Sequence, residues 1–211
     1  MIFYELIYMF YKGKISMKND YNQMMKEEIL KLTTTPTLLF HVCCAPCSSA
    51  CFDRLSAFDI TLYYFNPNTY PKDEYILRAE QFSKLTQLPL VVEEYDHNQF
   101  LSVIKGCEND IEGGERCKKC IKNRLIHSFE YAKNNGFDYI TTTLTISPHK
   151  DAEYINTIGK ELEKIYNIKF LPSDFKKENG FLNSINLSKQ FNLYRQDYCG
   201  CEFSINNKQK K

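Results

Sequence analysis

Short apolar runs alternate with stretches of helical periodicity along most of the chain, and this alternation constrains the fold more than any other feature. Runs such as TLLFHV at residues 37–42 and DITLYYF at residues 59–65 are rich in β-forming residues and predict buried strands. Strands that are separated by helices favour a parallel sheet with helices packed on its faces. We therefore predict a three-layer α/β fold with a mainly parallel sheet of about five strands.

The periodicity and the helix-breaking residues place these elements along the chain. Strands are expected at residues 37–42, 59–65, 88–93, 138–143 and 168–171. Helices are expected at residues 17–32, 46–58, 72–86, 96–105, 151–166 and 187–191, with a further helix that ends at Gly136. The segments that follow parallel strands meet at one edge of the sheet, where ligands bind. Residues 43–47 and 143–150 should therefore lie together at that edge.

Composition and charge exclude several classes of protein. The 211-residue chain contains 27 Lys and Arg against 26 Asp and Glu, so its net charge of +1 excludes a wholly basic nucleic-acid binder. Apolar residues make up 43% of the chain, which excludes a disordered protein. No secretory signal is visible, and the apolar start at residues 1–14 is shorter than the ~20 residues needed to span a bilayer. We expect a cytoplasmic protein that makes no membrane contact.

One main domain is expected, at residues 33–204. An N-terminal extension and helix would precede it at residues 1–32, and residues 1–16 of that extension would be spurious or disordered. A basic tail at residues 205–211 is expected to fray.

Nine cysteines are the second unusual feature, and seven of them fall into three tight groups. In a reducing compartment, clustered thiols are typical of metal binding or catalysis. The groups are Cys43-Cys44-x-x-Cys47, Cys117-x-x-Cys120 and Cys199-Gly200-Cys201. Seven thiolates exceed the four ligands of one zinc ion or one [4Fe-4S] cluster, which leaves three for a second metal or for redox chemistry. Cys51 is expected to be a small buried hydrophobe, and Cys107 an isolated bystander.

Spacing alone leaves a structural zinc site and an iron–sulfur cluster equally open. Two observations favour a redox site. The pool contains more thiols than a structural site requires, and the adjacent Cys43 and Cys44 are awkward ligands for one ion because neighbouring side chains tend to diverge. Cys47 and Cys117 are expected at helix starts, where backbone N–H groups stabilise thiolates. The sequence has no Walker-type or Gly-x-Gly-x-x-Gly motif, which disfavours ATP-driven chemistry.

Polar residues near the cysteine groups are candidates for substrate binding and proton transfer. His149 and Lys150 lie on the expected ligand edge, and Arg195 lies just before the third cysteine group. His41, within the first strand, is expected to be a satisfied core residue rather than a metal ligand. Residues 115–124 contain five basic residues and one acidic residue, and this local charge of +4 predicts a patch that binds RNA phosphates.

Several stretches together resemble the QueH-type epoxyqueuosine reductases. They are LLFHVCCAPCSS at 38–49, YFNPNTYPKDEYILR at 64–78, GGERCKKCIKNRL at 113–125, GFDYITTTLTISPHK at 136–150, DFKKENGF at 174–181 and LYRQDYCGCEFS at 193–204. The motifs occur in family order and span nearly the whole chain. Residues 1–16 lie outside the resemblance, and Phe100 stands at a position that we associate with Trp in the family.

The resemblance implies an iron–sulfur oxidoreductase that modifies tRNA, with a HUP-type, Rossmann-like fold and residues 33–204 as its catalytic domain. It implies the conversion of epoxyqueuosine to queuosine at the wobble base, the last step of queuosine biosynthesis. The epoxide oxygen would be removed with two electrons from an unidentified donor.

The resemblance also implies a [4Fe-4S] cluster with an additional iron, both held by the seven clustered cysteines. The division that we expect gives Cys44, Cys117, Cys120 and Cys199 to the cluster, and Cys43, Cys47 and Cys201 to the second metal. The residues expected to act in catalysis are Cys43, Cys47, Cys201, His149, Lys150 and Arg195, with Tyr198 as a further aid to the leaving oxygen.

Two other functions stay open at this point. A zinc-stabilised RNA-binding module would use the same cysteines without catalysis. A thiol–disulfide oxidoreductase would use Cys117-Lys118-Lys119-Cys120 as its redox pair.

Overall fold

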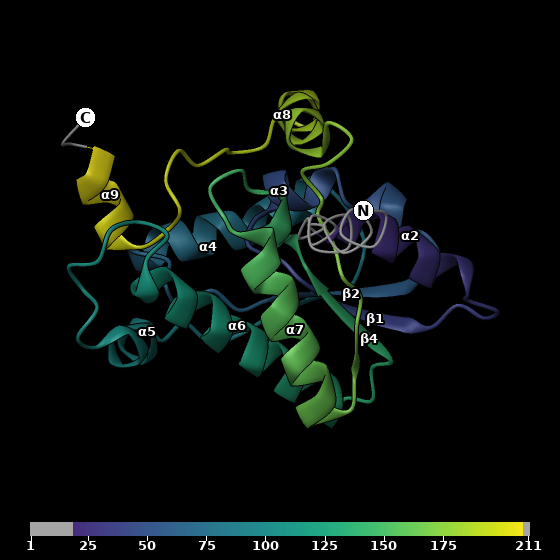
Figure 1. The fold of residues 1–211 in the computed structure, drawn as a ribbon. Helices are drawn as coiled ribbons and strands as arrows, with labels where there is room; N and C mark the ends of the chain where they lie inside the picture. Colours follow the sequence, from purple (N-terminus) through teal and green to yellow (C-terminus); the bar gives the residue numbers. More distant parts are fainter. Residues whose placement is uncertain (1–18, 209–211) are drawn as a thin grey trace, which may run out of the picture.

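The computed structural model describes residues 19–208, in which five parallel strands form one sheet (Figure 1). The strands are β1 (Thr37–His41), β2 (Asp59–Tyr64), β3 (Leu90–Val92), β4 (Tyr139–Thr142) and β5 (Lys169–Phe170). Their order across the sheet is β3-β2-β1-β4-β5. The prediction of a parallel sheet of about five strands is confirmed. Because β1 pairs with both β2 and β4, the strand order reverses there, and this is where α/β sheets bind ligands.

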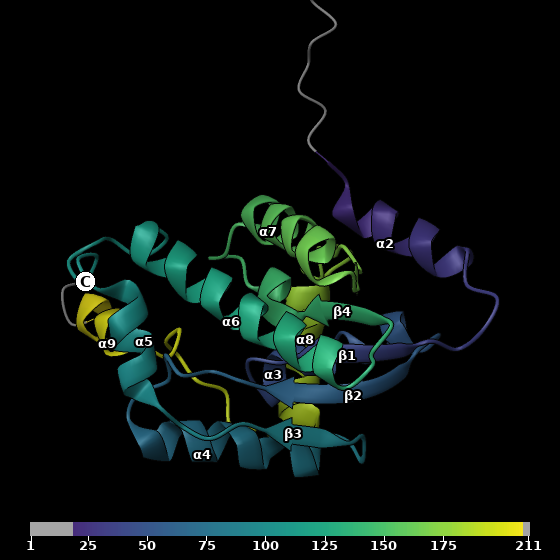
Figure 2. The same cartoon turned by 90° about the horizontal axis from the view of Figure 1, so that it is seen from below.

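Two helical layers cover the sheet, as the alternation of side chains along its strands requires. Leu38 and Phe40 of β1 pack in a core with residues of α2 (Tyr21–Leu30), α3 (Ala45–Ser49) and α4 (Lys72–Glu80). Leu39 points to the other face, where it packs against α6 (Glu115–Asn134). α7 (Ala152–Tyr166) packs beside α6 on that face (Figure 2). The predicted alternation of strands and helices along the chain thus gives the observed three-layer arrangement.

The remaining helices lie at the ends and edges of these layers. They are η1 (Phe52–Leu55), η2 (Gln81–Lys84), α5 (His97–Ile104), η3 (Thr143–Ile146), α8 (Gly180–Gln190) and α9 (Glu202–Lys208), of which the η elements are 3-10 helices. Among the residues that the structure describes, no helix is both long and apolar enough to cross a bilayer. Residues 1–16 of the predicted N-terminal extension lie outside the described residues, as do the last three residues of the predicted tail.

Several predicted helices differ in length from the observed ones, and the helix expected at 72–86 is α4 followed by η2. The expected helix at 46–58 is the five-residue α3 followed by η1, because the hydroxyls of Ser48 and Ser49 bond back to carbonyls at Cys44 and Pro46 and compete with helical bonding. The helix expected at 187–191 begins already at Gly180. α9 was not expected, since its seven residues are too few to show a helical period.

Candidate metal centre

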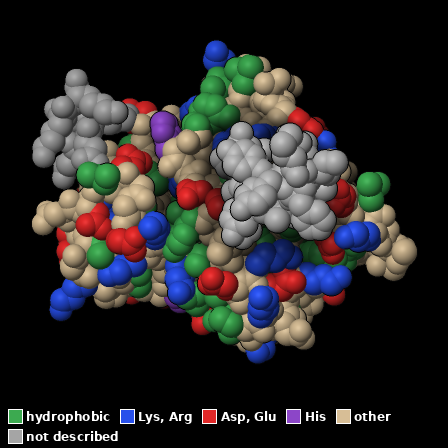
Figure 3. Space-filling model, in the orientation of Figure 1, with side chains coloured by type: hydrophobic (Ala, Val, Ile, Leu, Met, Phe, Trp, Pro, Cys, Tyr) green, Lys and Arg blue, Asp and Glu red, His purple; other side chains and the backbone are tan. Residues whose placement is uncertain are grey.

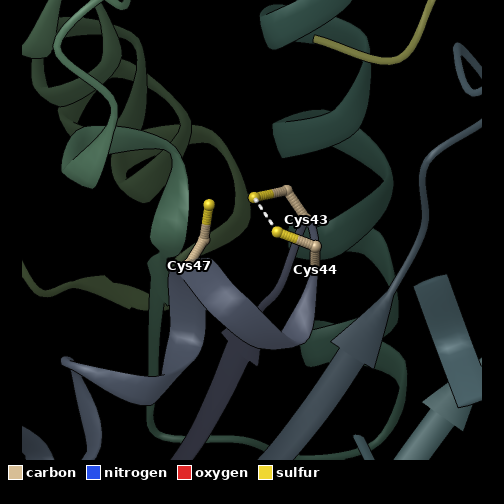
Figure 4. Close-up of side chains that lie close together, drawn as sticks. All are labelled: Cys43, Cys44 and Cys47. Carbon is tan, nitrogen blue, oxygen red and sulfur yellow. Dashed lines mark hydrogen bonds between the residues drawn. The ribbon is translucent and has the colours of Figure 1, made fainter. Parts of the chain in front are cut away.

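The first cysteine group lies between the end of β1 and the start of α3, and its three thiols converge. The sulfur atoms of Cys43, Cys44 and Cys47 lie within 4.8 Å of one another (Figure 4). The expectation that neighbouring Cys43 and Cys44 diverge is wrong, since their Sγ atoms are 3.9 Å apart. The chain bends at Cys43 as it leaves the strand, so the strand's alternation of side chains stops there.

This spacing fits a single metal ion. A tetrahedral ion with metal–sulfur bonds of about 2.3 Å places its ligand sulfurs about 3.8 Å apart. The Sγ–Sγ distance of 3.9 Å between Cys43 and Cys44 is close to that value. Three thiols from one short segment therefore have the spacing of metal ligands, as in catalytic sites that keep a fourth position open.

The other two groups meet in a neighbouring cavity of about 140 Å³. Cys117 and Cys120 lie three residues apart on the first turns of α6, on one face of the helix. Cys199 and Cys201 line the same cavity from the C-terminal segment. Gly200 between them has a φ of 139°, which other residues rarely adopt, and this conformation lets both cysteines face the cavity.

Contacts from the body of the fold hold this C-terminal segment in place. The Tyr70 N–H donates to the Gly200 carbonyl at 2.8 Å, and the Arg78 guanidinium donates to the Cys199 carbonyl at 3.2 Å. At its far end, the Glu202 carboxylate lies 3.0 Å from the His97 ring. None of these contacts involves a sulfur atom, so the segment is positioned by ordinary polar bonds.

A second cavity, of about 430 Å³, adjoins the first and contains Cys43 and Cys47 in its lining. Five residues line both cavities: Glu112, Arg124, His149, Lys150 and Cys199. Cys44 lies behind the cavities with 1% of its surface exposed, and the Gln196 side chain donates to its sulfur at 2.9 Å. The structure thus brings all seven clustered cysteines to the carboxyl edge of the sheet.

The segment after β4 lies beside Cys43, as predicted for residues 43–47 and 143–150. The Cys43 N–H donates to the Thr143 hydroxyl oxygen at 3.0 Å. That hydroxyl donates in turn to the Cys43 sulfur at 3.2 Å. A thiolate at Cys43 therefore has a fixed hydrogen-bond donor.

The thiols of the first group titrate very differently from one another. Hydrogen bonds from Cys44 and Cys47 hold the pKa of Cys43 well below its usual range. Burial is the largest cause that raises the pKa of Cys44, to about 12. Hydrogen bonding to Cys43 raises the pKa of Cys47 well above its usual range. The group by itself therefore favours one thiolate, and a bound cation would be needed to deprotonate the other two thiols.

Three of the thiols that line the smaller cavity, those of Cys117, Cys120 and Cys201, are held in the neutral form by their surroundings. Burial raises the pKa of Cys120 to about 12 and that of Cys201 to about 11. Burial raises the pKa of Cys117 as well. Metals bind the thiolate form of cysteine. These thiols are therefore expected to ionise only when a positive charge lies beside them. The donor set therefore fits a metal or an iron–sulfur cluster.

The other predicted site residues lie around the same cavities. His149 is exposed and Lys150 half-buried, and both line the two cavities. Burial by itself would lower the pKa of Lys150. The nearby Cys199 and Cys43 outweigh this effect and raise the pKa above its usual value, so the ammonium form is favoured. Arg195 lines the larger cavity and lies over the Phe181 ring at 5.3 Å.

Three residues that were expected to lie outside the site line neither of the two cavities. His41 is fully buried, with its Nδ1 at 2.7 Å from the Thr142 hydroxyl, and burial lowers its pKa to about 3. The prediction of a satisfied core histidine is confirmed. Cys51 is fully buried and its thiol donates to the Cys47 carbonyl, which confirms a structural role. Cys107 lines neither cavity.

The predicted basic patch at residues 115–124 is smaller than its sequence charge. Arg116 and Arg124 are only 2% and 3% exposed, so two of the five basic residues lie inside the protein. Lys118 forms an ion pair with Glu115 at 2.7 Å. On the face shown in Figure 3, Lys and Arg side chains are interspersed with Asp and Glu. Two of the five positive charges therefore lie below the surface, because a charge run does not reveal which side chains are buried. The binding of RNA phosphates by this segment stays a prediction.

Sequence reasoning missed four residues that shape the site: Thr143, Gln196, Arg78 and Arg124. Thr143 had a usable signal, since it follows β4 at the ligand edge. The two arginines had none, because each lies in a helix with a mixed charge pattern that resembles a solvated face.

The fold and the site together define an α/β protein with a thiol-rich candidate metal site at the point where its strand order reverses. The model of the epoxyqueuosine reductase QueH family matches residues 38–207. The chain therefore belongs to the epoxyqueuosine reductase QueH family, and the resemblance in its motifs is confirmed.

Individual relatives agree with the family model. The curated epoxyqueuosine reductase QueH of Streptococcus pyogenes serotype M1 is 39% identical over 200 residues, which cover 89% of this chain and 78% of that protein. The QueH of Staphylococcus epidermidis is 39% identical over 181 residues, covering 80% and 76%. The QueH of Thermotoga maritima is 34% identical over 185 residues, covering 83% and 93%.

Proposed function

We propose that this chain reduces epoxyqueuosine to queuosine in tRNA, using metal centres held by its seven clustered cysteines. Family membership supports the reaction. The single structural observation that supports it most is the convergence of Cys43, Cys44 and Cys47 beside a cavity that also reaches Cys199. Since tRNA is the proposed substrate, the proposed place of action is the cytoplasm. Residues 33–204, which contain the sheet and all seven cysteines, are the proposed catalytic domain.

The spacing of the sulfurs supports a particular division of the ligands. Cys43, Cys44 and Cys47 are close enough for one ion, and we propose that they hold the additional iron. The second set, Cys117, Cys120, Cys199 and Cys201, lines one cavity without all four sulfurs lying within 4.8 Å. A polynuclear cluster is larger than one ion and needs wider spacing, so we propose this set for a [4Fe-4S] cluster. This division moves Cys44 to the single ion and Cys201 to the cluster.

The reaction requires two electrons and two protons. Both C–O bonds of the epoxide break, a C=C bond forms between the two carbons, and the oxygen leaves as water. When bound, the iron centres would supply the electrons one at a time and a Lewis acid for the oxygen. The electrons come ultimately from an external donor.

The chain's own residues have three tasks in this reaction. The larger cavity, at about 430 Å³, is wide enough to admit a modified base that has been turned out of the anticodon loop. His149 and Lys150 line its wall and are proposed to donate hydrogen bonds and protons to the leaving oxygen. Arg195 and Tyr198, which belong to the same lining, are proposed to bind substrate.

The test is anaerobic incubation of the iron-loaded protein with tRNA that contains epoxyqueuosine and with a strong chemical reductant. Nucleoside mass analysis should show loss of one oxygen and appearance of queuosine. Variants Cys44→Ala and Cys199→Ala should both lose activity, whereas a thiol–disulfide oxidoreductase would lose it only in Cys117→Ala. A colourless protein with stoichiometric zinc and no iron, inactive in this assay, would refute the proposal and favour a zinc-stabilised RNA-binding module.

A further inference from the structure

Arg124 of α6 is a buried cation that belongs to none of the ion pairs found in the described part of the chain. Its side chain lies among buried residues, with only 3% of the residue exposed. An arginine cannot release its charge by losing a proton. A buried charge without a counter-charge is strongly unfavourable, so an anion is expected beside it.

Hydrogen bonds fix the orientation of this guanidinium. One terminal nitrogen of Arg124 donates to the Asn66 side-chain oxygen, and the Asn66 amide donates to the Val42 carbonyl at 3.0 Å. Val42 is the residue directly before Cys43. The Nε atom of Arg124 is buried and has no hydrogen-bond partner. One donor of a rigid cation is therefore left for a group that the polypeptide does not supply.

The position of Arg124 is shared by the two sets of cysteines. It lines both cavities, one containing Cys117, Cys120 and Cys201 and the other containing Cys43. Lys150 also lines both, but it is half-buried and close to the exposed His149, whereas Arg124 is enclosed. Arg124 is therefore an enclosed cation that lines the cavities of both sets of cysteines.

We infer that Arg124 is a positioning residue of the metal centre, whose fixed charge compensates anionic sulfur in both cysteine sets and raises the reduction potential of the cluster. The inference rests on the proposed function. Reduction adds a negative charge to the cluster, and a nearby cation with a free N–H donor stabilises the reduced form. The same charge favours the loaded state, because it offsets the thiolates that bind the metals.

The test compares Arg124→Gln and Arg124→Lys with the unaltered full chain. Arg54→Gln is the matched control, since Arg54 is also a largely buried arginine, with 16% of its side chain exposed, and lines neither cavity. Each protein is loaded with iron and sulfide without oxygen. Iron per chain is measured first, and the midpoint potential is then obtained by a redox titration followed by absorbance. Thermal unfolding of each variant checks the fold.

We expect Arg124→Gln to have a more negative midpoint potential than the unaltered protein, Arg124→Lys to retain most of the original value, and Arg54→Gln to match the unaltered protein. If Arg124→Gln folds but loses iron while Arg124→Lys keeps it, the charge is needed to hold the anionic centre, which also supports the inference. An unchanged potential in a fully loaded Arg124→Gln overturns it. Loss of iron from both folded variants overturns it too, because charge is then not the determining property.

These readouts do not depend on the reaction with tRNA. A loaded protein that shows the expected potentials but leaves epoxyqueuosine intact would refute the proposed function and leave the role of Arg124 standing. An active enzyme whose potential does not respond to Arg124→Gln would do the reverse.

Discussion

Replacement of Arg78 by methionine should destabilise the fold strongly, because it leaves a buried carboxylate without its counter-charge. Arg78 and Glu74 of α4 are 2% and 9% exposed, and the Arg78 Nε atom donates to a Glu74 oxygen at 2.7 Å. Removal of one partner of a buried ion pair costs about 3–5 kcal/mol. The Tyr194 hydroxyl, 3.0 Å from the other Glu74 oxygen, would still donate to it. We therefore expect a loss of about 3 kcal/mol, at the lower end of that range.

A double-mutant cycle separates this effect from simple loss of packing. The double variant Glu74→Leu/Arg78→Met has no charge left to bury, so it should be less destabilised than Arg78→Met alone. Free energies of unfolding come from urea titrations of the metal-free proteins, followed by circular dichroism. Lys160→Met is the control, because Lys160 pairs with Glu163 at the surface, where such pairs contribute about 0–1 kcal/mol.

Two results would refute this reasoning. The first is a loss below about 1 kcal/mol in Arg78→Met, which is the value for an exposed pair. The second is a double variant that is at least as destabilised as Arg78→Met, since the unpaired carboxylate would then not be the cause. Iron content adds a functional readout: Arg78 also donates to the Cys199 carbonyl, so Arg78→Met should hold less iron than Lys160→Met.

Three further changes test the construction of the site. Gly200→Ala should reduce iron per chain, because the φ of 139° is strained for alanine and the new Cβ would lie 3.0 Å from a side-chain nitrogen of the neighbouring loop; full iron content would contradict this. Cys51→Ala should keep normal iron content and Cys47→Ala should lose iron, and equal loss in both would show that Cys51 is a ligand. Thr143→Val should lower the free energy of unfolding by about 1–3 kcal/mol, because the Cys43 N–H is left without its acceptor. Thr143→Ser keeps the hydroxyl and should cost less than Thr143→Val, so the reverse order in a urea titration would argue against this hydrogen bond.

The layers of the fold could be predicted because they follow from local patterns. Within β1, Leu38 and Phe40 face one helical layer and Leu39 faces the other, as the period of a strand requires. The parallel order follows from the helices between the strands. The meeting of residues 43–47 with residues 143–150 then follows from the geometry of a parallel sheet, and the bonds between Cys43 and Thr143 confirm it.

The other features of the site could not be predicted, because they depend on contacts that no local sequence pattern contains. The convergence of Cys43 and Cys44 results from a bend between a strand and a helix, which residue spacing does not reveal. Arg124 is buried where its guanidinium meets Asn66, which follows β2, and where Cys199 of the C-terminal segment lines the same cavities. A sequence shows that a residue is charged, but its surroundings decide whether the charge meets solvent or a cofactor.

The long stretch of chain between the cysteine groups has a consequence for the stage of synthesis at which a cofactor can be inserted. Cys44 contacts Gln196, which follows it by 152 residues, and Cys201 closes the second cavity from further along still. During translation, the sheet and the first five clustered cysteines leave the ribosome well before the last two. An iron–sulfur cluster that arrived at that stage would meet only Cys117 and Cys120 of its four proposed ligands, so its stable insertion would have to follow release of the C-terminal segment. Acquisition of the proposed cluster would thereby become a check on chain completion, since a product truncated before Cys199 has the sheet but lacks Cys199 and Cys201.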